Sequence, residues 1–328
     1  MAGRGSRLRP HTLTVPKPLI PIAGKPIVQR LVEDIAKVCE EKIEEVAFVI
    51  GDFGTEVEQK LLNIAESIGA KGSIKYQEKP LGTAHAVLCA GDSLQGNTIV
   101  AFADTLFKAD FQLDATNDGA IWVKKVENPS SFGVVKLNEE GVITDFIEKP
   151  KTAVSDLAII GIYYFKSGES LRKALQYLVD HKIMGNGEYQ LTDALENMKN
   201  EGNKFVSAKV IDWLDCGNKD ATVDTNTRYL GYLDSEKIVD KSLKLVNSVV
   251  VPPVYIGKNV VLENTVIGPN VSVGDDCRIQ NSLLSNTIVQ ENTTISNANL
   301  TNSMLGNHVN LEGSPKDVSL GDYNTIKY

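Results

Sequence analysis

The order of hydrophobic and polar residues divides this chain into two parts with different periods. Up to about residue 233, short apolar runs that predict strands alternate with stretches of helical period. The expected helices span 26–42, 55–68, 83–90, 168–181, 188–199 and 221–233. The expected strands span 45–50, 73–77, 98–103, 120–126, 133–137, 142–148, 157–165 and 205–213. This alternation predicts an α/β fold with a mostly parallel sheet and helices on both faces.

The second part begins near residue 244 and repeats every five or six residues. Val, Ile and Leu are separated there by Asn, Gly, Asp and Ser, as in the stretches IGPNV and VGDDC. This spacing is that of the hexapeptide repeat, which predicts a left-handed parallel β-helix of roughly four coils. A small β-sandwich stays open as an alternative. We therefore expect an α/β domain at 1–233, a linker at 234–243 and a β-helix domain at 244–328.

Composition narrows the class of protein. The chain has 328 residues, of which 42% are hydrophobic and 23% charged, as in soluble globular proteins. Its net charge of −8 argues against general nucleic-acid binding. The four cysteines show neither metal nor disulfide spacing, and no signal peptide or long apolar run is visible. We expect a cytoplasmic protein that does not enter a membrane.

The opening segment, MAGRGSRLRPHTLTVPKPLIPIAGKPI, is the strongest candidate for chemistry. Gly3 and Gly5 permit a tight turn whose backbone N–H groups can face an anion. Arg7 adds a fork of donors suited to phosphate oxygens, and Lys17 adds a mobile positive charge. The prolines keep this segment out of helix. These features predict a polyphosphate site, although neither the dinucleotide fingerprint nor the ATPase phosphate loop is matched.

Two carboxylates follow apolar runs in the first part. Asp104 ends one in the stretch ADTLF, and Asp215 ends another in WLDCG. Open α/β sheets place their ligands at the carboxyl ends of strands. Two carboxylates that meet there would attract a divalent cation, and Mg²⁺ prefers one or two carboxylates together with phosphate oxygens. Either residue alone could equally be a turn or cap residue.

Two further loops carry polar residues suited to ligands. In QEKPLGTA, the amide of Gln77 can pair with a base edge, and Gly82 lets a flat ring approach the backbone. Thr83 offers a structural alternative for that loop, as a helix cap. Glu148 and Lys149 follow a strand and could bind sugar hydroxyls and a phosphate. An exposed charged turn would have the same sequence.

The opening segment resembles the G-x-G-(S/T)-R-L-x-P-x-T…K-P signature of the sugar-phosphate nucleotidylyltransferases. The matching residues are Gly3, Gly5, Ser6, Arg7, Leu8, Pro10, Thr12, Lys17 and Pro21. Within that family, the β-helix pattern is most similar to proteins of the glucose-1-phosphate thymidylyltransferase type. The resemblance implies a Rossmann-like catalytic domain and Mg²⁺ as cofactor. It also implies an NTP and a sugar 1-phosphate as substrates, joined with release of pyrophosphate.

The resemblance also assigns roles to residues. It implies catalytic roles for Arg7, Lys17, Asp104 and Lys149, and metal binding by Asp104 and Asp215. It implies nucleotide binding by Gly3, Gly5, Ser6, Arg7, Gln77, Gly82 and Thr83. It implies sugar-phosphate binding by Gly133, Glu148, Lys149, Gly161 and Tyr163. We expect dTTP or UTP with glucose 1-phosphate, and the alternative is a mannose-1-phosphate guanylyltransferase.

Other interpretations stay open beside this one. A non-catalytic binding or regulatory protein could use the same scaffold. Acyl transfer by His308 in the β-helix is disfavoured, because the repeat array is short. The flat coil faces instead suit symmetric assembly, so we expect a homo-oligomer. Family members usually carry an apolar strand ahead of the glycine loop, and here Met1 stands two residues ahead of Gly3. We expect a mis-assigned or trimmed start, with reduced stability.

Overall fold

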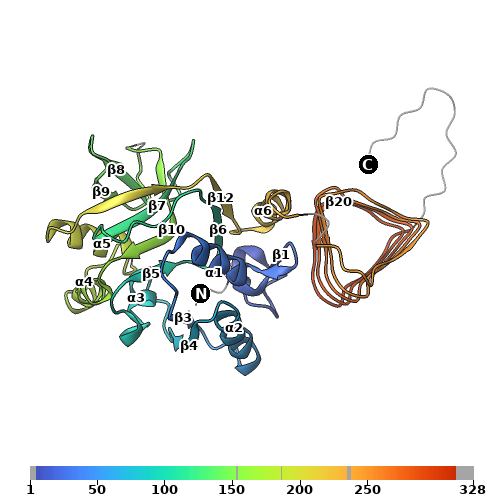
Figure 1. Cartoon of the computed structure of the whole chain (residues 1–328), viewed down its shortest axis with the longest axis horizontal. Helices are drawn as coiled ribbons and strands as arrows, with labels where there is room; N and C mark the ends of the chain where they lie inside the picture. Colours follow the sequence, from blue (N-terminus) through green and yellow to red (C-terminus); the bar gives the residue numbers. More distant parts are fainter. Residues whose placement is uncertain (1–4, 153, 186, 235–237, 315–328) are drawn as a thin grey trace. The chain divides into compact units, whose positions relative to one another are not determined.

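The computed structural model describes residues 5–152, 154–185, 187–234 and 238–314. Its internal contacts form two compact units, coloured along the sequence in Figure 1. The first unit runs to Ile20 and continues over Lys25–Asn218. The second comprises Pro21–Gly24 and the chain from Lys219 onward.

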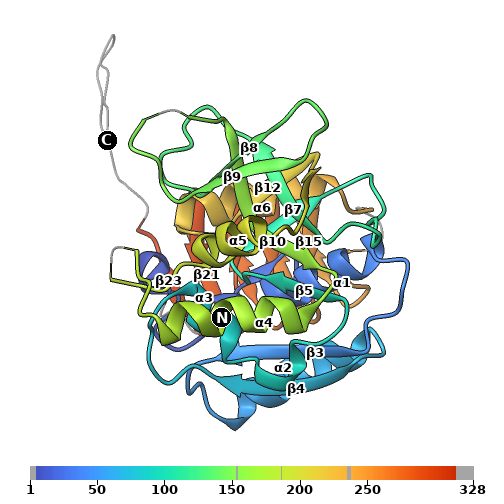
Figure 2. The same cartoon turned by 90° about the vertical axis from the view of Figure 1, so that its left-hand side faces the viewer.

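The first unit alternates helices with strands, as its hydrophobic pattern predicts. Its helices are α1 (Ile27–Val38), α2 (Thr55–Ser67), α3 (Thr83–Leu88), α4 (Gly168–Asp180) and α5 (Leu191–Asn200), labelled in Figures 1 and 2. Three short 3-10 turns are η1 (Ser6–Leu8), η2 (Lys17–Leu19) and η3 (Gly91–Ser93). Each predicted helix of this unit is confirmed to within a few residues of its ends, because each one buries apolar side chains on one face.

The sheets of the first unit are mixed. Strand β10 (Leu157–Phe165) pairs in antiparallel fashion with β5 (Thr98–Ala101), β7 (Gly119–Lys125) and β8 (Val134–Leu137). Strand β9 (Ile143–Ile147) is antiparallel to β8, and β11 (Phe205–Lys209) is parallel to β7. Strand β3 (Glu45–Ile50) pairs in parallel with β4 (Lys71–Tyr76). Parallel pairing therefore dominates only where helices separate the strands along the chain.

One strand was predicted where the structure has two. The run 205–213 divides into β11 and β12 (Asp212–Asp215), and β12 pairs with the short strand β6 (Thr105–Lys108) in an antiparallel ribbon. Strand β6 escaped prediction because its four residues give no period. The ribbon positions the candidate site.

The apolar core of this unit lies between β7, β10 and helices α4 and α5. Ile121, Val123, Phe165, Leu175 and Leu195 have no exposed surface at all. Burying side chains of this size stabilises the fold by about 1.5–3 kcal/mol each. The strands next to this core are therefore a rigid base for the loops at their ends.

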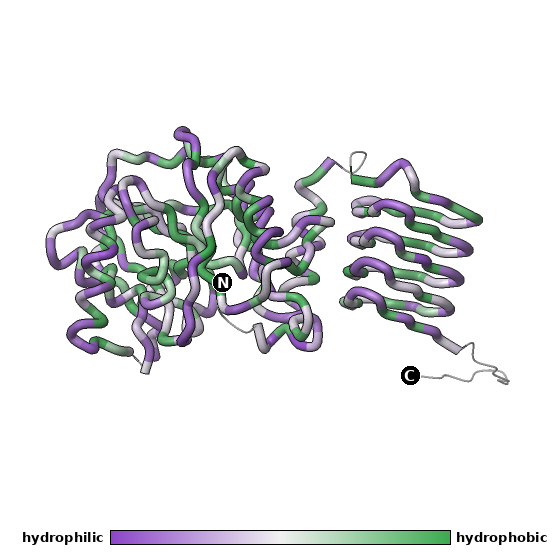
Figure 3. Tube along the Cα trace, turned by 90° about the horizontal axis from the view of Figure 1, so that it is seen from below, coloured by the Kyte–Doolittle hydropathy of each residue, from purple (hydrophilic) through white to green (hydrophobic). Residues whose placement is uncertain are grey.

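The second unit contains a parallel β-helix, which confirms the repeat interpretation. Its strands are β13 (Lys244–Val246), β14 (Val249–Val250), β15 (Val254–Ile256), β16 (Val261–Glu263), β17 (Val266–Ile267), β18 (Val271–Val273), β19 (Arg278–Gln280), β20 (Leu283–Val289), β21 (Thr294–Ser296), β22 (Asn299–Leu305) and β23 (Asn310–Glu312). All pair in parallel from coil to coil, and Figure 3 shows the stacked coils. Leu262, Ile279 and Ile295 fill the interior with no exposed surface.

Asparagines form the corners of the coils. Asn247, Asn264, Asn281 and Asn297 all have left-handed backbone, with φ between 46° and 54°. Each side chain donates to the next across 16 or 17 residues, with N···O distances of 2.8, 3.2 and 3.2 Å. Asparagine tolerates this conformation better than other residues with a side chain. His308 takes the same conformation at another corner, with φ 57°.

Helix α6 (Lys219–Gly231) packs inside the second unit. The buried Asn226 accepts hydrogen bonds from the Ala23 N–H at 2.9 Å and from the Ser272 hydroxyl at 2.7 Å. Gly24 lies so close to the ring of Tyr255 that a Cβ there would overlap it. Segment 21–24, α6 and the β-helix therefore form one packed body. In the described part of the chain, no helix is long and apolar enough to cross a membrane.

Candidate active site

The β6–β12 ribbon brings the two predicted metal-binding carboxylates together. Strand β12 ends at Asp215, whose partner in the ribbon is Thr105, the residue after Asp104. The Cys216 N–H donates to the Asp104 carbonyl at 3.0 Å. Residues 111 positions apart in the sequence thus share one end of the ribbon, so the expected meeting of the two aspartates is found.

Neighbouring groups offset part of the repulsion between these two carboxylates. Burial, and then the negative charge of Asp104, raise the pKa of Asp215 above its ordinary range. The Gly217 N–H, which donates to Asp215 Oδ1 at 2.9 Å, opposes that rise, as do the charges of Lys17 and Arg7. The Lys17 Nζ lies 3.0 Å from Asp104 Oδ2. A cation between the two carboxylates would therefore relieve a repulsion that the fold imposes.

The donor set of this corner fits Mg²⁺ as the family resemblance implies. No group of three or more His, Cys, Asp or Glu side chains in the described ranges could hold a metal by itself. Mg²⁺ commonly takes one or two carboxylates and completes its shell with phosphate oxygens and water. Asp104 and Asp215 would supply those two carboxylates, and a bound nucleotide would supply the remaining oxygens.

The glycine loop lies against Lys17. Gly5 has left-handed backbone (φ 58°), and its carbonyl accepts the Thr12 hydroxyl at 2.8 Å. A Cβ at Gly5 would stand 3.0 Å from the Lys17 Cβ. Leu8 is fully buried and anchors the turn η1, while Ser6 and Arg7 stay exposed. The loop therefore presents its polar residues beside the carboxylate pair. Gly3 lies outside the described residues.

The predicted base-binding loop is built around Gly82. The Gln77 amide donates to the Gly82 carbonyl at 3.2 Å, and its Nε2 lies 3.0 Å from His85 Nδ1. Gly82 has φ 114°, and a Cβ there would stand 2.4 Å from the Tyr189 carbonyl oxygen. Only glycine fits this close approach. Gln77 is therefore held in one orientation at the end of β4.

Thr83 makes a structural contact in this loop. Its hydroxyl accepts the Leu191 N–H at 3.0 Å and so satisfies one donor at the start of α5. The capping alternative therefore describes a contact that the structure contains, at the start of α5. Nucleotide binding by Thr83 stays a prediction.

The predicted sugar-binding pair lies together at the end of β9. Glu148 Oε1 and Lys149 Nζ are 3.3 Å apart. The Thr192 hydroxyl donates to Glu148 Oε2 at 3.2 Å, and a Cβ at Gly133 would stand 3.1 Å from that same oxygen. Lys149 has φ 41°, a conformation that costs about 1–2 kcal/mol for a residue with a Cβ. Such strain is often found at functional sites.

Tyr163 and Gly161 lie on strand β10. Burial, and then the charge of Glu148, raise the pKa of Tyr163, so its hydroxyl stays protonated at neutral pH. Gly161 has φ 86°, and its missing Cβ leaves room for the Phe102 ring. That ring packs edge-on against Tyr163 at 5.8 Å between centroids. Gly161 therefore acts through packing, and direct sugar contact by either residue stays a prediction.

Sequence reasoning missed three residues of the site. Thr192 and Asp193 lie in the stretch GEYQLTD. Burial raises the pKa of Asp193, and the negative charge of Glu148 raises it further. Trp213 packs edge-on against Phe132 at 4.8 Å, and its Nε1 donates to the Thr105 hydroxyl. This contact joins the ribbon to the loop of Gly133. The apolar pattern indicated the elements that carry these residues, but it could not indicate which loops they face.

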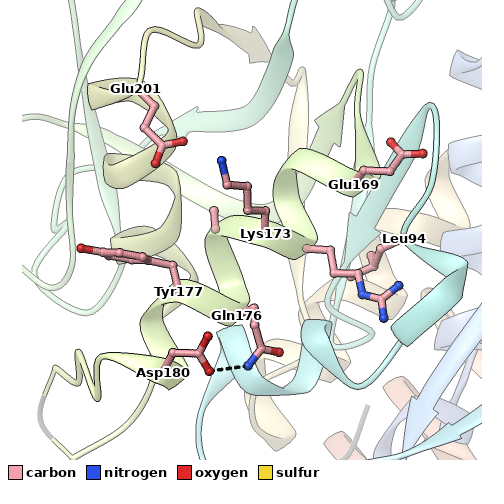
Figure 4. Close-up of a pocket in the computed structure, with 9 residues that line it drawn as sticks. Leu94, Glu169, Lys173, Gln176, Tyr177, Asp180 and Glu201 are labelled. Carbon is pink, nitrogen blue, oxygen red and sulfur yellow. Dashed lines mark hydrogen bonds between the residues drawn. The ribbon is translucent and has the colours of Figure 1, made fainter.

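A separate hollow of about 540 Å³ lies along α4. Figure 4 shows its lining, in which Lys173 stands among Glu169, Asp180 and Glu201, and the Gln176 amide donates to Asp180 at 2.7 Å. None of the predicted site residues lines it. The charges there are mixed, so this hollow has no part in the candidate site.

Comparison with known proteins identifies the class. The family model described as "Nucleotidyl transferase" matches residues 1–231, and the chain belongs to that family. It is 31% identical to the low-salt glycan biosynthesis nucleotidyltransferase Agl11 of Haloferax volcanii, covering 75% of this chain and 71% of that protein. It is 28% identical to a glucose-1-phosphate thymidylyltransferase of Streptomyces griseus, covering 96% and 92%.

Structural comparison agrees with this assignment. A UDP-glucose pyrophosphorylase solved with UDP-glucose aligns with a TM-score of 0.58 and 26% identity, covering 71% of this chain and 97% of that one. The chain spans only 57% of the length of a relative named bifunctional protein GlmU, from Methanococcus maripaludis. Its relatives and structural neighbours are thus sugar-phosphate nucleotidyltransferases.

The close approach at Gly82 gives a stability prediction. Gly82→Ala should destabilise the first unit more than Gly91→Ala does. Both residues have positive φ, but no atom lies within 4 Å of a Cβ built at Gly91. The control should therefore cost only the conformational strain, about 1–2 kcal/mol. Thermal denaturation without ligand measures both variants, and equal losses would contradict the packing at Tyr189.

Proposed function

We propose that the chain transfers a nucleotidyl group from an NTP to a sugar 1-phosphate. The observation that carries this proposal is the carboxylate pair, with Lys17 bonded to Asp104 and the charges of Lys17 and Arg7 acting on Asp215. A fold that holds two aspartates beside two cations at a glycine loop is suited to polyphosphate and a divalent cation. Family membership supports the same class of reaction.

Each residue of the site would contact a different part of the two substrates. The backbone at Gly5 and Ser6, with Arg7, would hold the β- and γ-phosphates that leave as pyrophosphate. Lys17 would contact the α-phosphate, and Lys149 would bind the phosphate of the incoming sugar. The sugar phosphate oxygen then forms a bond to the α-phosphorus as the bond to pyrophosphate breaks. Mg²⁺ on Asp104 and Asp215 would neutralise charge during this step. Positioning and electrostatics supply most catalysis of such reactions.

The proposed substrates are dTTP or UTP and glucose 1-phosphate. The thymidylyltransferase relative and the UDP-glucose pyrophosphorylase neighbour support that choice by their names. The amide oxygen of Gln77 can accept an N–H from a base edge, which thymine, uracil and guanine each offer. Mannose-1-phosphate guanylyl transfer therefore remains the alternative. Cytoplasmic location and the absence of nucleic-acid binding stay predictions from composition.

The direct test is pyrophosphate release by the purified chain with Mg²⁺, across five NTPs and several sugar 1-phosphates. We expect one strongly preferred pair, with a pyrimidine nucleotide and glucose 1-phosphate. Preference for GTP with mannose 1-phosphate would establish the alternative. No release from any pair by the folded protein would favour a binding or regulatory role on the same scaffold.

The metal assignment has its own test. Asp104→Asn should retain the fold but lower kcat at least about a hundredfold at saturating Mg²⁺, because it removes a charge that acts in the transition state. Asp110→Asn, at an exposed position outside the site, is the matched control. Kinetics and circular dichroism are measured on both variants. Near-normal turnover of Asp104→Asn would exclude this residue as a metal ligand.

We also infer that the β-helix mediates self-association. Val249, Val266 and Leu283 stack in register from coil to coil, and Val249 and Leu283 are 57% and 45% exposed. An apolar row on a flat face suits packing against a second copy. Leu283→Lys should lower the oligomeric state in sedimentation, whereas Thr294→Lys, on another face, should not. This inference would be refuted if Leu283→Lys left the oligomeric state unchanged, or if the wild-type chain were a monomer.

A further inference from the structure

His85 lies on helix α3, which is labelled in Figure 2, and the proposed reaction gives it no role. Its ring contacts Gln77, the residue that follows β4 and is proposed to meet the base. His85 Nδ1 lies 3.0 Å from Gln77 Nε2 and 3.8 Å from Cys89 Sγ. Both neighbours carry hydrogens that can point at this one ring nitrogen. The protonation of Nδ1 therefore decides how the three side chains are arranged.

A backbone carbonyl fixes the orientation of the Gln77 amide. The Gln77 side chain is only 8% exposed, and its amide lies 3.2 Å from the Gly82 carbonyl oxygen. That oxygen also accepts the Ala86 N–H at 3.0 Å in the first turn of α3, so it cannot turn away. A carbonyl oxygen can only accept a hydrogen bond, so the amide faces it with its NH₂ group. The same NH₂ group then faces His85.

His85 must therefore accept a hydrogen bond at Nδ1. A neutral imidazole has one acceptor nitrogen, so its hydrogen lies on Nε2. Burial lowers the pKa of His85, which favours this neutral ring. Burial, and then the charge of Glu78, raise the pKa of Cys89, so the thiol keeps its hydrogen and can donate it to Nδ1. A hydrogen on Nδ1 would instead point at the hydrogens of the Gln77 NH₂ group.

This arrangement leaves the amide oxygen of Gln77 for a ligand. Within the ranges of the chain that the structure describes, no group donates a hydrogen bond to Gln77 Oε1. An oxygen there can accept the ring N–H on the pairing edge of thymine, uracil or guanine. Cytosine and adenine carry a lone pair at the equivalent ring nitrogen, so two acceptors would face each other. A flipped amide would present NH₂ and reverse this preference.

We propose that His85 is a positioning residue for base selection, which holds the Gln77 amide with Oε1 toward the nucleobase by accepting its NH₂ group at Nδ1. The proposal rests on the proposed function, because it takes Gln77 as the residue that contacts the base. It adds the chemical feature that is selected, a ring N–H on the pairing edge, and the residue that enforces the selection.

The kinetic test compares two variants of His85. His85→Leu removes the acceptor, whereas the amide oxygen of His85→Asn can take the place of Nδ1. The value of kcat/KM is measured for dTTP and dCTP, or for GTP and ATP if the chain prefers purines, with Mg²⁺ and the preferred sugar 1-phosphate. We expect His85→Leu to lower the preference for dTTP over dCTP at least about tenfold, mainly through KM, and His85→Asn to restore most of it. His181→Leu, at an exposed position after α4, is the matched control and should retain the wild-type preference.

A second measurement needs no turnover. NMR of the free chain with nitrogen-labelled histidine shows which ring nitrogen carries the hydrogen, and the signal that disappears in His85→Asn belongs to His85. We expect a neutral ring with its hydrogen on Nε2 at neutral pH. A hydrogen on Nδ1 at neutral pH, in a neutral or a charged ring, would overturn the proposal. This result also decides the matter if His85→Leu does not fold.

The outcomes separate this proposal from the proposed reaction. If the wild type is active and folded His85→Leu has an unchanged preference, the role of His85 is refuted and the reaction is not. If the wild type releases no pyrophosphate from any pair, the reaction is refuted, and the preference is measured as the ratio of Kd values for dTTP and dCTP by calorimetry. A lower ratio of affinities in His85→Leu then supports the positioning role. An unchanged ratio, or no binding of either nucleotide, refutes it.

Discussion

The candidate site depends on a fold that holds two carboxylates close together. Among the described residues, no third carboxylate, histidine or cysteine helps them to fix a cation. Asp104 and Asp215 repel each other, and the chain offsets this with Lys17, Arg7 and the Gly217 N–H. The β6–β12 ribbon keeps the two residues in place because its hydrogen bonds are independent of the charges. A flexible loop would let the carboxylates separate, and the attraction for a divalent cation would be lost with the geometry.

The start of α5 connects the other two parts of the site. Its first N–H is satisfied by Thr83 in the base loop, and its second residue, Thr192, donates to Glu148. Tyr189, two residues before the first residue of α5, packs on Gly82. A change in the base loop would therefore displace the hydroxyl that orients Glu148. We infer that the nucleotide and sugar regions share one rigid support, with Trp213 and Phe132 connecting that support to the carboxylate ribbon.

Sequence reasoning was accurate where a single physical signal dominates. Strands β3 and β10 begin and end where the buried apolar runs do. The pairing of Asp104 with Asp215 followed from the rule that ligands collect at strand ends. Features that depend on long-range contacts could not be predicted from the sequence. The break between β11 and β12, the strand β6 and the packing of α6 against the β-helix depend on tertiary partners that no local period encodes. Thr192 was missed for the same reason, since its role exists only through Glu148.

The two units differ in the range of the contacts that stabilise them. Each β-helix coil contacts the next, so an asparagine corner depends on residues only 16 or 17 positions away. The site in the first unit instead rests on Lys17 with Asp104, Thr83 with Leu191 and Glu148 with Thr192, which are distant in sequence. Loss of one coil contact is a local event, whereas displacement of the β6–β12 ribbon or of the start of α5 would move several parts of the site together.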